Sequence, residues 1–310
     1  MPLHPQVVRF LEAQRALGLT PIEQDTPEEF RQLLRAGIAA PGEPEAIESI
    51  EDREIAGPEL PIRMRIYSPV GRTSEGALVY YHGGGWVAGD LDTHDALCRA
   101  LANTAGCLLV AVDYRLAPEH RYPAAVDDAR AAFQWVCDHA PELGVAPNCV
   151  AVGGDSAGGN LAAVVSLMAR DLQQPLPCLQ VLIYPIVDRD FTTSSYQQFA
   201  EGYSLTASGM RWFWQQYLPE SADSQAPYAS PLRAADVTRL PPALVITAQY
   251  DVLCDEGNQY ATRLQTAGVP TEWKCYDGMI HGFVSRINFF DAAREAATQI
   301  ASALQRSFDS

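Results

Sequence analysis

The sequence predicts an α/β fold with a mostly parallel central sheet and helices on both faces. Two observations support this fold class. From residue 77 onward, short apolar runs alternate with helix-forming segments, as they do in consecutive strand-helix-strand units. Runs such as residues 108–112 are also continuously apolar, which is typical of strands buried on both faces. Ligands bind beyond the carboxyl ends of such strands, so we expect functional side chains there.

Two helices are expected before the sheet, over residues 5–18 and 27–36. Thr26 and Glu29 have the spacing of a capping box at the start of the second helix. Residues 40–44 are rich in proline and glycine and predict a linker. Residues 45–68 predict two strands, because apolar side chains alternate with others over the second half of that segment.

The remaining elements follow from the alternation of apolar runs and helical segments. Strands are expected at 77–81, 108–113, 149–153, 179–184, 243–247 and 271–276. Helices are expected at 93–105, 123–140, 157–172, 254–267 and 287–308.

A long interval between Tyr184 and Pro242 interrupts this rhythm. It holds nearly sixty residues, which is too long for a structureless loop in a compact domain. We expect an inserted helical cap, including a helix that begins after Thr206 and carries the aromatic residues 212–214. The predicted organisation is an N-terminal helical part of the cap (1–45), a first core segment (46–185), the inserted cap (186–235) and a second core segment (236–310).

Composition excludes several classes of partner. The 22 basic and 38 acidic residues give a net charge of −16, which disfavours nucleic acid and anionic membranes and favours a small uncharged substrate. No apolar run is long enough for a membrane span, so none is expected. The seven cysteines are scattered and form no C-x-x-C pair, so we expect neither a disulfide framework nor a metal site. Without a signal-peptide pattern, the expected location is the cytoplasm.

The run from Gly154 to Gly158, Gly-Asp-Ser-Ala-Gly, predicts a nucleophilic serine. It lies between an apolar strand and a helix-forming run. A strand that turns sharply into a helix crowds its backbone, and the two glycines remove side chains that would clash. Ser156 is therefore expected at the tip of a tight turn, at a helix N-terminus that favours developing negative charge.

A serine hydroxyl needs a base, and the base needs a carboxylate that orients it. His281 is the candidate base, because it follows the last strand at the edge where ligands are expected to bind. Asp251 ends the preceding strand and is the candidate acid. Three other carboxylates remain rivals for the role of acid: Asp255, Glu256 and Asp277.

Residues 82–86, His-Gly-Gly-Gly-Trp, directly follow the strand at 77–81 and predict a loop that binds an oxyanion. Glycines let the backbone approach a ligand and point its amides at developing negative charge. His82 is expected to hold this loop by hydrogen bonding. Which two of the three glycines donate stays open; the candidate donors are the amides of Gly83, Gly84, Gly85 and Ala157.

The same glycines formally fit a dinucleotide-binding fingerprint. That motif needs a helix that starts directly in the loop and an acidic residue about twenty positions further on. Here Gly89 and Asp90 interrupt the loop, and the nearest acid at a strand end is Asp113. We therefore expect no dinucleotide cofactor.

Together these motifs resemble the bacterial hormone-sensitive-lipase-like (family IV) branch of the α/β-hydrolase carboxylesterases. The resemblance extends from about residue 77 to residue 283 and implies an α/β-hydrolase fold with a helical cap. Ser156, Asp251 and His281 also occur in the chain order of a triad in this fold. One departure is Val252, where the family usually has proline. The matching stretches are His82-Gly-Gly-Gly-Trp86, Asp113-Tyr-Arg-Leu-Ala-Pro-Glu119, Gly154-Asp-Ser-Ala-Gly-Gly159 and His281-Gly-Phe283.

The resemblance implies a serine carboxylesterase that hydrolyses short- to medium-chain acyl esters through an acyl-enzyme, without cofactor or metal. An amidase, a carbamate hydrolase or a lactonase would use the same triad, and a non-catalytic ligand receptor of this fold is a further alternative. The oligomeric state is left open, a homo-oligomer included. The side chains expected to line the substrate pocket are Trp86, Tyr184, Leu205, Phe213 and Ile280.

Overall fold

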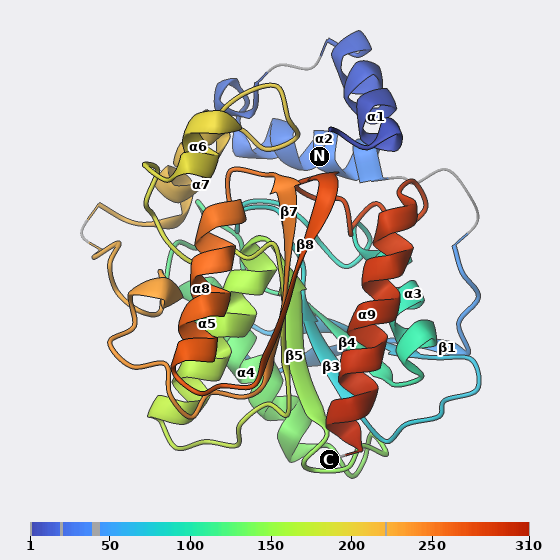
Figure 1. Ribbon diagram of the computed structural model, residues 1–310. Coiled ribbons are helices and arrows are strands. Elements are labelled where there is room, and N and C mark those ends of the chain that lie inside the picture. Colours follow the sequence, from blue (N-terminus) through green and yellow to red (C-terminus); the bar gives the residue numbers. More distant parts are fainter. Residues whose placement is uncertain (1, 19–20, 39–43, 221, 310) are drawn as a thin grey trace.

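In the computed structural model, which describes residues 2–18, 21–38, 44–220 and 222–309, eight strands form one sheet (Figure 1). The strands are β1 (Ser49–Ile55), β2 (Ile62–Ser68), β3 (Ala77–Tyr81), β4 (Leu108–Asp113), β5 (Val150–Asp155), β6 (Gln180–Ile183), β7 (Ala243–Tyr250) and β8 (Thr271–Ile280). Their order across the sheet is β1-β2-β4-β3-β5-β6-β7-β8. β2 pairs antiparallel with both β1 and β4, and the remaining neighbours are parallel. The predicted α/β fold with a mostly parallel sheet is therefore confirmed.

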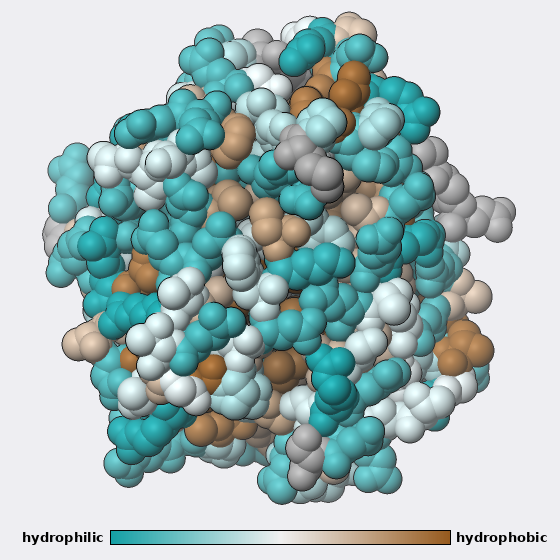
Figure 2. Space-filling view, viewed as in Figure 1, coloured by the Kyte–Doolittle hydropathy of each residue, from teal (hydrophilic) through white to brown (hydrophobic). Residues whose placement is uncertain are grey.

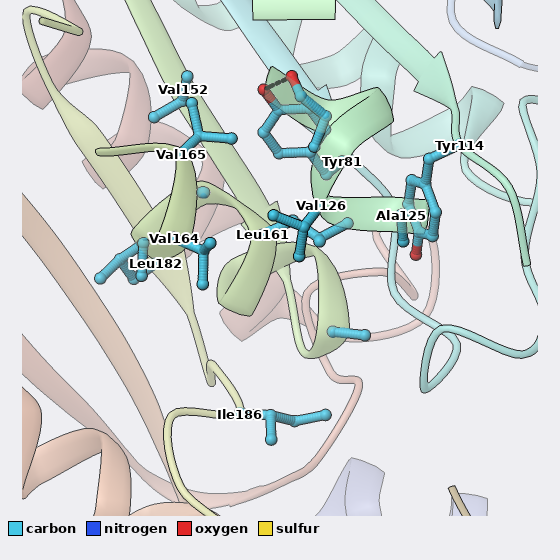
Figure 3. Close-up of a cluster of buried hydrophobic side chains, with 14 of the residues drawn as sticks. Tyr81, Tyr114, Ala125, Val126, Val152, Leu161, Val164, Val165, Leu182 and Ile186 are labelled. Carbon is cyan, nitrogen blue, oxygen red and sulfur yellow. Dashed lines mark hydrogen bonds between the residues drawn. The ribbon is translucent and has the colours of Figure 1, made fainter. Parts of the chain in front are cut away.

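Helices cover both faces of this sheet (Figure 1). They are α3 (Asp95–Ala105), α4 (Ala124–Asp138), α5 (Ala157–Asp171), α8 (Cys254–Thr266) and α9 (Asp291–Phe308). Val79 and Tyr81 of β3 belong to a core shared with α4, α5 and α8, which Figure 3 shows in part. Leu78 and Tyr80 belong to the opposite core, shared with α3 and α9. Because alternate residues of β3 face different cores, the whole strand is apolar.

β8 runs further than the sequence predicted, to Ile280, and β7 extends to Tyr250, next to Asp251. Their pairing is irregular after Ala248 and resumes with Tyr250 opposite Ile280. The next residues along the chain are Asp251 and His281. The extended pairing therefore brings the candidate acid and the candidate base to the same edge of the sheet.

The remaining helices gather beyond that edge (Figure 1). They are α1 (Pro5–Ala16), the short η1 (Ile22–Gln24), α2 (Pro27–Ile38), α6 (Ser194–Gln198) and α7 (Ala207–Tyr217). The short η2 (Pro231–Arg233) instead packs beside α5 and α8. The predicted capping box is present, since the Thr26 amide donates to Glu29 Oε2 over 2.8 Å. The Thr206 hydroxyl likewise accepts from the Gly209 amide at the start of α7, over 3.0 Å. Most of the expected linker, residues 40–43, lies outside the described residues.

The N-terminal helices pack against the inserted segment and against the core. The Phe30 ring of α2 lies edge-on to Trp212 and Phe213 of α7, at centroid distances of 6.1 and 5.4 Å. The Arg31 guanidinium donates to Glu119, which belongs to the first core segment of the chain, over 2.9 and 2.6 Å. These contacts join the two expected parts of the cap, whose exact boundaries stay a prediction.

The face shown in Figure 2 is mainly hydrophilic, with apolar side chains scattered across it. Among the helices that the structure describes, none has both the length and the apolar character of a membrane span.

Candidate active site

Ser156 occupies the sharp turn between β5 and α5. Its backbone has φ of +56° and ψ of −115°, a conformation that residues other than glycine rarely adopt. A Cβ on Gly154 would lie 2.4 Å from the Tyr81 carbonyl oxygen, and one on Gly158 would lie 1.8 Å from the same atom. Both positions therefore require glycine, because the turn presses α5 and β5 against β3. The turn places Ser156 at the N-terminus of α5, where the helix dipole favours negative charge.

Three side chains from three separate loops form one hydrogen-bonded series. Ser156 Oγ lies 2.9 Å from His281 Nε2, and His281 Nδ1 lies 2.7 Å from Asp251 Oδ2. Asp251 Oδ1 accepts a further 3.0 Å hydrogen bond from the Leu253 amide. Val252, which replaces the usual proline, is buried, and the loop holds the carboxylate without that proline. An imidazole in this position can take the serine proton while the buried carboxylate orients the ring.

The rival carboxylates are engaged elsewhere or point to solvent. Asp255 Oδ2 accepts a 2.8 Å hydrogen bond from an amide of α6. Glu256 Oε1 accepts two hydrogen bonds, of 2.8 and 3.3 Å, from consecutive amides of the inserted segment. Asp277 is exposed on β8. Of the four candidate acids, only Asp251 is hydrogen-bonded to His281.

On the glycine loop after β3, one of the predicted oxyanion donors is wrong. The Gly83 amide donates to Asp155 Oδ1 over 2.9 Å, so it is not available to an oxyanion. Gly84 and Gly85 adopt φ of +119° and +62°, conformations that favour glycine. In the described part of the chain, the amides of these two glycines and of Ala157 have no protein acceptor. These three amides are the remaining candidate donors.

His82 braces the glycine loop from within the core. Its Nδ1 lies 2.8 Å from the Gly83 carbonyl oxygen, and its ring stacks on Tyr114 at a centroid distance of 4.3 Å. The Tyr114 hydroxyl also donates to the His82 carbonyl oxygen over 2.7 Å. Burial and the neighbouring His94 lower the pKa of His82, which favours the neutral ring at neutral pH.

Asp155, the residue before the serine, is a buried group to which the sequence analysis gave no role. Its Oδ1 accepts from the Tyr80 hydroxyl over 2.8 Å and lies 3.3 Å from His94 Nε2, in addition to its bond with Gly83. Burial acts to raise the pKa of Asp155, but His94, the Tyr80 hydroxyl and His82 together hold that pKa below its usual value. A charged carboxylate therefore anchors the glycine loop to the serine turn.

Comparison with known proteins agrees with this geometry. A family model described as the alpha/beta hydrolase fold matches residues 78–285. The chain belongs to the α/β-hydrolase family. It is 41% identical to the carboxylic ester hydrolase LipN of Mycobacterium tuberculosis, over 98% of this chain and 82% of LipN. It is 36% identical to the ethyl acetate hydrolase of Pseudomonas putida, over 99% of each chain. A solved structure of a hyperthermophilic esterase from the archaeon Pyrobaculum calidifontis matches with a TM-score of 0.91 at 44% identity, over 99% of each chain.

Two of the predicted pocket residues of this α/β-hydrolase lie beside the site. A Cβ on Gly85 would be 2.1 Å from the Phe213 ring, so that ring lies directly against the glycine loop. The Tyr184 ring is 4.7 Å from the His281 ring, measured between centroids. Both aromatic side chains are buried. That these two rings line a substrate pocket stays a prediction.

The other three predicted pocket residues are also buried, and none of their described side-chain contacts involves a triad side chain. Trp86 stacks on Tyr217 of α7 at a centroid distance of 4.0 Å, so it joins the cap to the core. Leu205 belongs to the core cluster on the α5 face, and Ile280 to the cluster on the α9 face. Their place in a pocket stays a prediction.

The loop geometry of this α/β-hydrolase differs from that of a dinucleotide-binding protein. α3 begins at Asp95, ten residues after Gly85, so the glycine loop does not open directly into a helix. Among the described residues, no group of three or more His, Cys, Asp or Glu side chains is placed to hold a metal ion.

Proposed function

We propose that this α/β-hydrolase cleaves carboxylic esters by nucleophilic catalysis at Ser156. The observation that carries the proposal is the series from Ser156 through His281 to Asp251, with distances of 2.9 and 2.7 Å. A base within reach of a hydroxyl, itself oriented by a buried carboxylate, activates a serine for acyl transfer. The names of the relatives, a carboxylic ester hydrolase and an ethyl acetate hydrolase, support an ester as the bond cleaved.

Each proton in the proposed cycle moves at a defined atom. Ser156 Oγ attacks the ester carbonyl carbon while His281 Nε2 takes the hydroxyl proton. Asp251 holds Nδ1–H and stabilises the imidazolium that forms. His281 then donates its Nε2 proton to the leaving alcohol, and the acyl group stays on Ser156. A water molecule, deprotonated by His281, attacks the acyl-enzyme and releases the carboxylic acid.

The carbonyl oxygen gains negative charge in both steps, and we assign its stabilisation to the amides of Gly84, Gly85 and Ala157. The positive φ values of the two glycines and the place of Ala157 at the start of α5 support this assignment. Gly83 contributes indirectly, because its amide fixes the loop to Asp155.

A small uncharged ester with a short- to medium-chain acyl group is the proposed substrate. The net charge of −16 disfavours anionic substrates, and the Phe213 ring restricts the space beside Gly85. The cytoplasmic location rests on the scattered free cysteines and stays a prediction, as does any homo-oligomer.

A phosphonate ester tests the nucleophile directly. After incubation with p-nitrophenyl ethylphosphonate, we expect one covalent adduct, on the peptide that contains Ser156. Ser156→Ala should lose both the adduct and the hydrolysis of p-nitrophenyl butyrate. Ser166→Ala is the matched control, because Ser166 lies on α5 with its hydroxyl bonded to the Ala162 carbonyl oxygen. An active Ser156→Ala variant would refute the proposal, and faster cleavage of the matched p-nitroanilide would reassign the bond to an amide.

A further inference from the structure

Two of the seven cysteines meet where α8 covers β7 and β8. Cys254 is the first residue of α8, and Cys275 lies opposite Thr247 in the register of β8 with β7. The Asn258 amide donates to Cys254 Sγ over 3.5 Å, and the Thr247 hydroxyl donates to Asn258 Oδ1 over 3.0 Å. Residues opposite each other on neighbouring strands face the same side, so both thiols gather around Thr247 and Asn258.

The surroundings of the two thiols make their pKa values unequal. Hydrogen bonding with the Cys254 side chain and with the Thr247 hydroxyl lowers the pKa of Cys275 to about 7. The same bond and burial raise the pKa of Cys254. Both side chains are partly exposed, so a small reagent can reach them. A thiolate beside a second thiol has the attacking and resolving groups of a redox pair.

We propose that Cys254 and Cys275 form a redox-active pair that a hydroperoxide oxidises to an intramolecular disulfide. The Cys275 thiolate attacks a peroxide oxygen, the O–O bond breaks, and Cys275 becomes a sulfenic acid, while the departing oxygen takes a proton from solvent and leaves as water or an alcohol. The Cys254 sulfur then attacks the sulfenic sulfur, and the hydroxyl leaves as water with the Cys254 thiol proton. The two thiols are oxidised by two electrons, and the peroxide is reduced.

The other cysteines lack this combination. Cys98 and Cys107 are buried, and burial raises the pKa of both thiols. Burial also raises the pKa of Cys137 to about 12 and that of Cys178 to about 11. Cys149 is partly exposed, but burial and nearby acidic groups raise its pKa too. The lowered pKa of Cys275 therefore predicts selective oxidation at this pair.

Because of where the two cysteines lie, a disulfide between them should stabilise the fold. The Cys254 amide donates to the Asp251 carbonyl oxygen over 3.1 Å, and Cys275 precedes His281 on the same strand. A bond between the two sulfurs ties the loop that carries Asp251 to the strand that leads to His281. We expect the oxidised protein to unfold at a higher temperature than the reduced protein, because the unfolded chain is constrained. This inference does not depend on ester hydrolysis.

Mass spectrometry of the full chain tests the pair. After treatment with hydrogen peroxide, the intact mass should fall by about 2 Da, and proteolysis should yield one cross-linked peptide containing Cys254 and Cys275. Cys254→Ser and Cys275→Ser should each abolish the cross-link, whereas Cys137→Ser should keep it. Independent alkylation of both thiols after peroxide treatment, or a cross-link between other cysteines, would overturn the proposal.

Trapping of the sulfenic acid with dimedone identifies the attacking thiol. In the Cys254→Ser variant, dimedone should label Cys275 strongly, because no second thiol resolves the sulfenic acid. In the Cys275→Ser variant, labelling of Cys254 should be weak. Equal labelling in the two variants would contradict the assigned roles. The unfolding temperature of each reduced variant should match the reduced parent, which shows that the serine substitutions leave the fold intact.

Discussion

The Gly83 amide and the Asp155 carboxylate are joined by a 2.9 Å hydrogen bond that links the glycine loop to the turn before Ser156. The two residues are 72 positions apart in the chain: Gly83 lies on the loop that follows β3, and Asp155 is the last residue of β5. Because Gly83 immediately precedes Gly84 and Gly85, the direction of their amides depends on this bond. Asp155 therefore acts on the oxyanion site through the loop and is a positioning residue.

Asp155→Ala should lower kcat for p-nitrophenyl butyrate by about 10- to 100-fold, because misaligned amides stabilise the oxyanion less well. KM should change little, since the bond serves the transition state more than substrate binding. Asp155→Asn retains an acceptor for the Gly83 amide and should lose less activity. Tyr80→Phe is the matched control, because it removes another hydrogen bond to the same carboxylate. A kcat loss in Tyr80→Phe as large as that in Asp155→Ala would argue against the role of the Gly83 bond.

The identity of the acid can be decided between two neighbouring carboxylates. Asp251→Asn should lower kcat by about 10⁴-fold, because an amide no longer holds the His281 tautomer that accepts the serine proton. Asp255→Asn should stay within a few fold of the parent, because its carboxylate holds an amide of α6 and not His281. Steady-state rates at saturating ester distinguish the two. An Asp255→Asn variant as impaired as Asp251→Asn would reopen the assignment.

The serine turn could be predicted from the sequence because its causes are local. A tight turn needs glycines at fixed distances from Ser156, and both glycines are within two positions of it. Asp251 and His281 could be predicted as candidates because Asp251 ends an apolar strand and His281 comes shortly after the last strand in the sequence. The role of Asp155 was not predictable, because its partner His94 is distant in the chain and leaves no local pattern around either residue.

The order of the strands in the sheet could likewise not be predicted from local sequence patterns. Alternation of strands and helices predicted a mostly parallel sheet, and the structure confirms it. Alternation does not say that β4 lies between β2 and β3, since that order arises from the crossover through α3. Side-chain pairs from different elements, such as Cys254 and Cys275, likewise cannot be predicted from a local sequence pattern.

The size of the acyl pocket should depend on Phe213. Phe213→Leu removes part of the ring that lies against Gly85, so longer acyl chains should fit. We expect the ratio of kcat/KM for p-nitrophenyl octanoate to that for the butyrate to rise about 10-fold. Phe191→Leu is the matched control, because that ring packs edge-on to Tyr196 at 5.4 Å. If the two variants shift the ratio equally, the change reflects a loosened cap and not the pocket.

Glu256 should make stability depend on pH. Its side chain is buried, its Oε1 accepts two amides, and its Oε2 has no partner among the described residues. Burial raises the pKa of Glu256 well above the usual value, and Asp188 and Asp251 act in the same direction. The folded protein therefore holds this proton more tightly than the unfolded chain. The stabilisation is complete below the unfolded pKa of about 4.3 and is lost as the pH rises toward the folded pKa.

Glu256→Gln keeps an oxygen for the two amides but cannot ionise, so it should escape this loss. The difference in unfolding temperature, variant minus parent, should grow in favour of the variant between about pH 5 and about pH 8. Glu142→Gln is the matched control, because it removes one negative charge from an exposed position of this acidic chain. Calorimetry of the three proteins at both pH values measures the difference. A gap that stays constant, or that grows equally in Glu142→Gln, would mean that general charge repulsion and not the buried carboxyl sets the pH dependence.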